Sequence, residues 1–246
     1  MVAPYAMRTV ATFLSTLALL AAGLASPLGA QTGPCQPDKD GGLTCGSGPG
    51  AARVVEGTMS PSKRFAFAWR APGSSSADDP DPDKVENLLI RISDGAVLWS
   101  ARGRYWQTAG SRSNHIDQGA VWSPNSRLAV EVTDSKWSTD ELRFFSIAED
   151  SKLLVLDLHA IIEPAVRKQL RGLVKNESAY TFSVTWSDTA PRGLAVDNRG
   201  QVTVPVLMQI PKQDRDVTFD VKLLVDEKSG ALAARDVSVR RSRAKD

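Results

Sequence analysis

One stretch of the sequence decides the fold: Val121-Trp122-Ser123-Pro124-Asn125-Ser126-Arg127-Leu128-Ala129-Val130. Its pattern is an aromatic residue, Ser-Pro, a basic residue and then an apolar-Ala-apolar run. Two other stretches share much of it, at nearly the same spacing: Met59-Ser60-Pro61 followed by Arg64-Phe65-Ala66-Phe67, and Trp186-Ser187-Asp188 followed by Arg192-Gly193-Leu194-Ala195-Val196. A fixed period of this kind is typical of a repeat architecture.

Each copy is followed by strand-like runs around a turn. The three predicted hairpins cover residues 88–99, 142–158 and 217–239, and the first has Asp94-Gly95 at its turn. An Asp-Gly pair tolerates the positive φ that tight hairpins require. The sequence therefore predicts an all-β protein with three propeller-blade-like antiparallel sheet units, or alternatively a β-sandwich.

The repeated motif resembles the WD-repeat-like β-propeller unit of Tol-system and related exported bacterial proteins. In that family the motif is a turn between two blade strands, and its aromatic residue packs inward. The resemblance implies a rigid scaffold that presents loops to a partner. Propellers normally close with four to eight blades. With only three copies, the alternatives are an open capped stack, a homodimer that completes one ring, and a sandwich.

One amphipathic helix is predicted between the second and third copies. Apolar residues recur with a helical period from Ile161 to Val174, and Arg167, Lys168, Arg171 and Lys175 occupy the opposite face. We expect Pro164 in the first helical turn, where its missing N–H is harmless. Contact of this basic face with a membrane is the less favoured alternative to simple solvation.

The ends of the chain differ from the predicted β-repeat domain, residues 53–240. Residues 1–30 combine Arg8, an apolar core and a small residue before a cleavage site, which predicts a signal peptide and export to the periplasm or outside the cell. In residues 31–52, Cys35 and Cys45 flank a turn-rich segment and are expected to form a disulfide rather than a reactive thiol pair. Residues 241–246 are expected to form a basic tail.

Composition excludes several classes of function. The 246 residues include 30 Lys+Arg and 28 Asp+Glu, so the chain lacks the strong basic excess of a nucleic-acid binder. With 2 His and 2 Cys, little remains to hold zinc, iron–sulfur or haem, and the sequence contains no glycine-rich phosphate loop. We therefore predict no cofactor and no metal. Ser60-Pro61-Ser62-Lys63 matches a nucleophile motif of penicillin-binding proteins, but it precedes a strand rather than opening a helix.

The predicted binding surface combines aromatic and basic residues in loops, which are the types that anchor interfaces. Its residues are Arg104, Tyr105, Trp106, Arg112 and Trp137. Tyr105 and Trp106 could equally be core residues of a strand. The alternative catalytic pair is His115 with Asp117, as a base and the carboxylate that orients it.

Together these features predict an exported, non-catalytic binding protein of the cell envelope that recognises another envelope protein. An envelope hydrolase that acts on glycan or peptide is one alternative. A glycan-binding module is the other, with Tyr105, Trp106 and Trp137 as stacking platforms.

Overall fold

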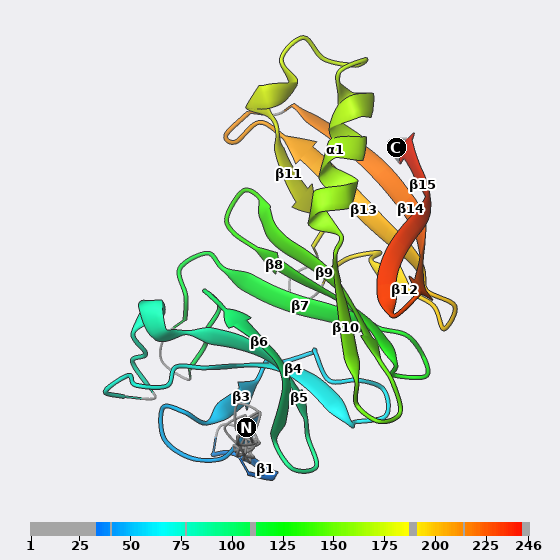
Figure 1. Cartoon of the computed structure of the whole chain (residues 1–246). Helices are drawn as coiled ribbons and strands as arrows, with labels where there is room; N and C mark the ends of the chain where they lie inside the picture. The colour runs from blue at the N-terminus through cyan, green and yellow to red at the C-terminus, as the bar shows by residue number, and fades with distance from the viewer. Residues whose placement is uncertain are drawn as a thin grey trace, which may run out of the picture.

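The computed structural model describes residues 33–39, 41–76, 78–108, 112–186, 191–213 and 215–242. They form three antiparallel sheets and one α-helix, as predicted for an all-β protein with one inserted helix (Figure 1). The expected signal peptide, residues 1–30, lies outside the described residues. No helix in the described ranges is long and apolar enough to cross a membrane.

Each sheet is built from strands that follow one another in the chain. The first sheet contains β1 (Cys35–Pro37), β2 (Leu43–Cys45), β3 (Ala52–Val54), β4 (Phe65–Arg70), β5 (Glu86–Arg91) and β6 (Ala96–Arg102). The second contains β7 (Asp117–Trp122), β8 (Leu128–Asp134), β9 (Thr139–Ile147) and β10 (Leu153–Asp157). The third contains β11 (Thr181–Val184), β13 (Gln201–Gln209), β14 (Asp216–Lys228) and β15 (Ala231–Arg241), and β12 (Ala195–Val196) also pairs with β13. The helix is α1 (His159–Leu170), and the two 3-10 turns are η1 (Pro82–Lys84) and η2 (Glu177–Ala179).

The Ser-Pro motif forms the same turn in the first two sheets. The Ser60 N–H donates to the Phe65 carbonyl at 2.8 Å, and the Phe65 N–H donates back to Ser60 Oγ at 3.1 Å. Ser123 and Leu128 make the same two bonds at 2.8 and 3.0 Å. Ser60 thus caps the turn between β3 and β4, and Ser123 caps the turn between β7 and β8. Ser60 does not open a helix.

The matching turn of the third sheet lies at Asp197 rather than at the predicted Trp186-Ser187-Asp188, of which Ser187 and Asp188 lie outside the described residues. Between β12 and β13, the Asp197 N–H donates to the Gln201 carbonyl at 3.1 Å, and the Gln201 N–H donates to Asp197 Oδ1 at 2.8 Å. Gly200 has a φ of 83°, and a Cβ there would overlap a carbonyl oxygen of β14. Residues 185–194 separate β11 from β12 and displace the turn along the sequence.

The three turns lie side by side and are joined by hydrogen bonds. The Ser62 N–H donates to Ser126 Oγ at 2.9 Å, which joins the first turn to the second. The Asn125 N–H donates to Asn198 Oδ1 at 2.9 Å, which joins the second to the third. The sheets therefore stack in the same orientation, with their equivalent turns at one end.

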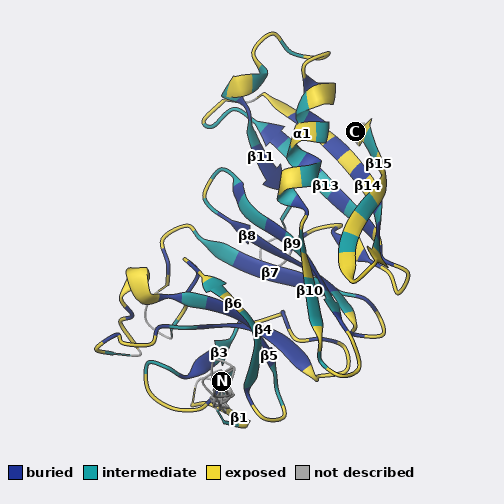
Figure 2. Ribbon diagram, viewed as in Figure 1, coloured by how far each residue is buried: buried dark blue, intermediate teal, exposed yellow. Residues whose placement is uncertain are grey.

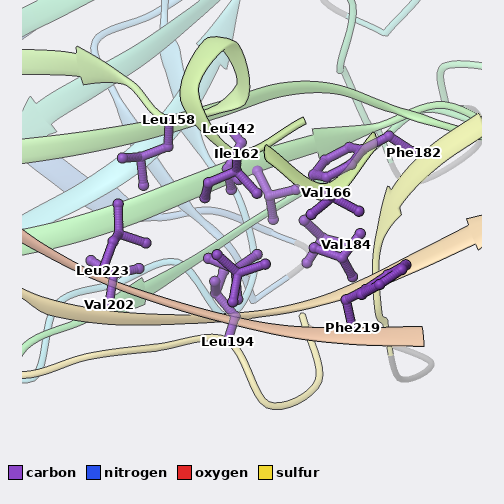
Figure 3. Packing of buried hydrophobic residues seen from close by; sticks show 14 of the residues in the cluster. Leu142, Leu158, Ile162, Val166, Phe182, Val184, Leu194, Val202, Phe219 and Leu223 are labelled. Atoms are coloured by element: carbon purple, nitrogen blue, oxygen red, sulfur yellow. The ribbon is translucent and has the colours of Figure 1, made fainter. Parts of the chain in front are cut away.

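The sheets pack by their faces, with the second between the other two (Figures 1 and 2). An aromatic cluster joins the first and second sheets: Phe67 and Phe145 meet edge to face at 5.2 Å, and Trp122 lies 5.8 Å from Phe67. The larger core joins the second and third sheets and includes Ile162, Val166 and Leu170 of α1 (Figure 3). The helix thus fills the space between two sheets.

The helix differs from the prediction at both ends. It begins at His159, where the Ala160 N–H donates to Asp157 Oδ1 at 3.1 Å, so Pro164 lies inside the helix rather than in its first turn. It ends at Leu170, and Leu173 beyond it is 46% exposed. Pro164 lies on the exposed side, where solvent can satisfy the carbonyl that it leaves without a helical partner.

The two outer faces of the stack are covered differently. Ala66, Ala68, Leu88 and Ile90 line the outer face of the first sheet and are fully buried, with the Cys35–Cys45 disulfide packed against them. The outer face of β14 instead exposes the polar residues Asp216, Thr218, Asp220 and Lys222. Within the described residues, neither end of the stack therefore presents a large apolar face to solvent. The disulfide also fits an oxidising, exported compartment.

The last strand is longer than predicted. Arg241, the first residue of the expected basic tail, pairs with Phe219 in the β14–β15 register, and the Ser242 N–H donates to the Thr218 carbonyl at 2.9 Å. Residues 243–246 lie outside the described residues.

Candidate functional site

A cleft of about 770 Å³ lies where the three sheets meet. The first sheet lines it with residues 55–57, which follow β3, and with Tyr105, which follows β6. The second contributes the ends of β7 and β8, and the third contributes β11, Trp186 and Leu207. Its size is typical of sites for small ligands. We call it the three-sheet cleft.

Two carboxylates oppose each other at its wall. Asp117 begins β7 and is the cross-strand partner of Asp134, which ends β8. Side chains at such positions are direct neighbours, and like charges there repel. Asp117 is half exposed, and one of its carboxylate oxygens lies 3.5 Å from an Arg112 nitrogen. Asp134 is only 7% exposed.

The pKa of Asp134 is raised to about 7, mainly by burial and to a smaller extent by the charge of Asp117. A hydrogen bond of 2.5 Å from Thr139 Oγ1 opposes the rise. Thr139 Oγ1 also accepts the Val184 N–H at 2.7 Å, so one hydroxyl fixes the carboxylate and joins the second sheet to the third. A carboxyl group with a strongly perturbed pKa in a cleft is typical of a functional site.

A buried polar network supports this wall from behind. Gln118 lines the cleft, and its Nε2 donates to Glu131 Oε1 at 3.1 Å. Glu131 is fully buried and also accepts a bond of 2.8 Å from Thr133, while an Arg143 nitrogen lies 3.4 Å from its other oxygen. Burial raises the pKa of Glu131 despite the opposing charge of Arg143. The network fixes the Gln118 amide at the cleft surface.

Trp186 forms an aromatic wall that sequence reasoning did not assign to the site. Its ring rests on Gly119 of β7 and lies beside Pro191, so a Cβ at Gly119 would come within 2.9 Å of the indole and 2.8 Å of the proline. The indole N–H is buried, and in the described chain it makes no hydrogen bond that meets the geometric criteria. It nevertheless contributes to lowering the pKa of Asp134. The sequence pattern predicts Trp186 only as the aromatic residue of the third motif copy.

The predicted aromatic loop is not exposed. Tyr105 and Trp106 are 6% and 8% exposed and pack with Val55, Trp69 and Val85. Asn87 holds the segment inward, because its Nδ2 donates to the Tyr105 carbonyl at 2.9 Å. Their role as accessible binding or stacking residues is therefore corrected: the aromatic rings fill the end of the first sheet instead of reaching solvent.

Tyr105 nevertheless reaches the cleft with its hydroxyl end. Its O–H donates to Gln107 Oε1 at 2.7 Å. Burial raises the pKa of this phenol to about 12, so it stays a neutral hydroxyl at physiological pH. Tyr105 and Gln107 also border a second hollow of about 670 Å³, where the Arg53 guanidinium lies 5.1 Å from the Trp69 ring centre.

The other predicted binding residues are divided between two places. Arg112 lines the cleft beside Asp117. Arg104 forms an ion pair with Asp140, and the Trp137 ring packs under Lys136 Nζ at 5.2 Å. Arg104, Trp106 and Trp137 are not among the residues that line the cleft. The predicted set is thus not one surface.

His115 lies at the mouth of the cleft, exposed and with a φ of 55°. Within the described ranges no hydrogen bond joins it to Asp117, whose ion-pair partner is Arg112. The predicted acid–base pair shares the cleft but lacks the contact that would orient the imidazole. No three His, Cys, Asp or Glu side chains of the described chain cluster as metal ligands.

No protein-family model and no curated protein matches the sequence.

Proposed function

We propose that this protein is an exported binding protein of the cell envelope, periplasmic or secreted, that holds its ligand in the three-sheet cleft. The observation that supports it is the cleft itself, because all three sheets contribute polar side chains that converge there. Sheets that stack by their faces leave their strand ends free to form such a site. This arrangement also agrees with the proposed resemblance to propeller-like scaffolds, which present loops at the ends of their blades.

Photo-crosslinking in living cells tests this function. A benzophenone amino acid replaces Thr185 at the cleft in one variant, and Thr218 on the exposed face of β14 in the matched control. We expect a covalent adduct, measured by the mass of the intact purified protein, from the Thr185 variant only. Equal adduct formation at both positions, or none at Thr185, would contradict the proposal.

Hydrolysis in the same cleft is a second candidate function, favoured by the two carboxylates. Two neighbouring carboxyl groups, one of which has a raised pKa, are the pattern of glycoside hydrolases. In that reaction Asp134, with its pKa near 7, would act as the acid, and the more exposed Asp117 would act as the base or nucleophile. Release of sugar from purified peptidoglycan, lost in Asp134→Asn and kept in Asp220→Asn, would establish it. An unchanged rate in Asp134→Asn would exclude Asp134 as the acid.

A further inference from the structure

We propose that the ligand of the three-sheet cleft is a neutral, hydroxyl-rich molecule, namely a short glycan. This inference rests on the proposed function, because it names the class of ligand for the same site. Three features of the cleft support it: its balance of charge, the type of its polar groups, and its size with one aromatic wall.

The charged groups of the cleft nearly cancel. Its acidic residues are Glu56, Asp117 and Asp134, and its basic residues are Arg112 and Lys136, with His115 at the mouth. Asp117 and Arg112 already form a pair at 3.5 Å. Asp134 is partly protonated at neutral pH, because burial raises its pKa to about 7. A charged ligand would therefore meet groups of both signs, and the cleft selects neither a cation nor an anion by its overall charge.

The uncharged polar groups both donate and accept hydrogen bonds. They are Tyr105, Gln107, Gln118, Ser135, Ser183 and Thr185. Hydroxyl and amide side chains offer donors and acceptors side by side, and an alcohol group of a ligand has the same double capacity. The Asp117–Arg112 pair adds an acceptor beside a donor. A polyol can satisfy such a set without leaving a buried charge unpaired.

The dimensions favour a small ligand over a protein surface. Stable protein–protein interfaces bury about 800 Å² on each partner over a broad area. A concave site of about 770 Å³ is instead in the range of pockets for small molecules. Trp186 provides a flat aromatic surface, and the C–H face of a sugar ring can pack on it.

Titration calorimetry on the full purified protein tests the inference. The probes are chitotriose, cellotriose and maltotriose, compared with trialanine, trilysine and triglutamate at the same concentrations. The cleft variant is Thr185→Arg, which places a long side chain into the cleft, and the matched control is Thr218→Arg on the outer face of β14. We expect at least one trisaccharide to bind, and its Kd to rise by about tenfold or more in Thr185→Arg but not in Thr218→Arg.

Three results would overturn the inference: no binding by any trisaccharide, tighter binding of a tripeptide, or an equal loss in both arginine variants. A cleft adduct from the Thr185 crosslinking variant together with no trisaccharide binding would leave the proposed function standing and refute the glycan. Circular dichroism of both variants shows that a loss of binding is not a loss of fold. A tripeptide that binds, and is lost only in Thr185→Arg, would assign the cleft to a peptide instead.

Discussion

Asp134→Asn is expected to change how stability depends on pH. In the unfolded chain this carboxyl group has its ordinary pKa of 3.8, whereas in the folded protein burial raises the pKa to about 7. Between these values the folded state binds more protons, so the free energy of unfolding falls as pH rises. The difference between the two pKa values lowers the free energy of unfolding by about 4 kcal/mol. This penalty is absent below pH 4 and complete above pH 7. An amide cannot ionise, and therefore Asp134→Asn removes the penalty.

The assay is urea unfolding followed by tryptophan fluorescence, with the free energy extrapolated to water at each pH from 4 to 9. The stability of Asp134→Asn relative to the unmodified protein should rise by up to about 4 kcal/mol across this range. Asp220→Asn changes an exposed carboxylate of β14 and should give a curve parallel to that of the unmodified protein. A constant difference between Asp134→Asn and the unmodified protein would refute the argument from burial.

Three further variants test the scaffold by the same unfolding assay. Gly200→Ala should destabilise the protein by about 2 kcal/mol or more, because the residue needs a positive φ and a Cβ would overlap a β14 carbonyl; an unchanged midpoint would contradict this. Replacing Cys35 and Cys45 by serine should cost about 2.7 kcal/mol for a sequence separation of 10, and a reducing agent should lower the Tm of the unmodified protein alone. Gly119→Ala should cost about 1–3 kcal/mol and alter the near-ultraviolet circular dichroism, since the Cβ displaces Trp186; an unaltered spectrum would place the indole elsewhere.

Short-range signals predicted the scaffold well. The turns at Ser60 and Ser123 depend on side-chain-to-backbone bonds within five residues, so the local sequence contains all the necessary information. The third turn lies at Asp197 and not at the predicted position, because the strand that precedes it is β12 (Ala195–Val196) and not β11 (Thr181–Val184). A spacing argument assumes equal copies, and an insertion inside a strand moves the turn while leaving the strand pairing intact.

The site was predicted less completely, because strand pairing decides which residues share it. Arg112, predicted as a binding residue, and His115 with Asp117, the alternative catalytic pair, all line the cleft. Asp134 was missed, because only the strand register places it opposite Asp117. The visible signal in the sequence was a carboxylate at the end of an apolar strand. The burial of Tyr105 also could not be read from the sequence, because it depends on Asn87, which is distant in the sequence and holds the loop inward.

Core packing uses the faces of the sheets and the cleft uses the ends of the strands, which explains how this small scaffold can support a site. Almost all apolar packing occurs between sheet faces, where two clusters join the first, second and third sheets. The cleft lies at strand ends, so residues that line it outside the core, such as the half-buried Thr185 and the exposed Arg112, can change without loss of core packing. Asp134 and Glu131 are exceptions, because they are buried at the junction and their ionisation opposes folding. Substitutions at the mouth should therefore alter binding alone, whereas substitutions of the two buried carboxylates should alter both binding and stability.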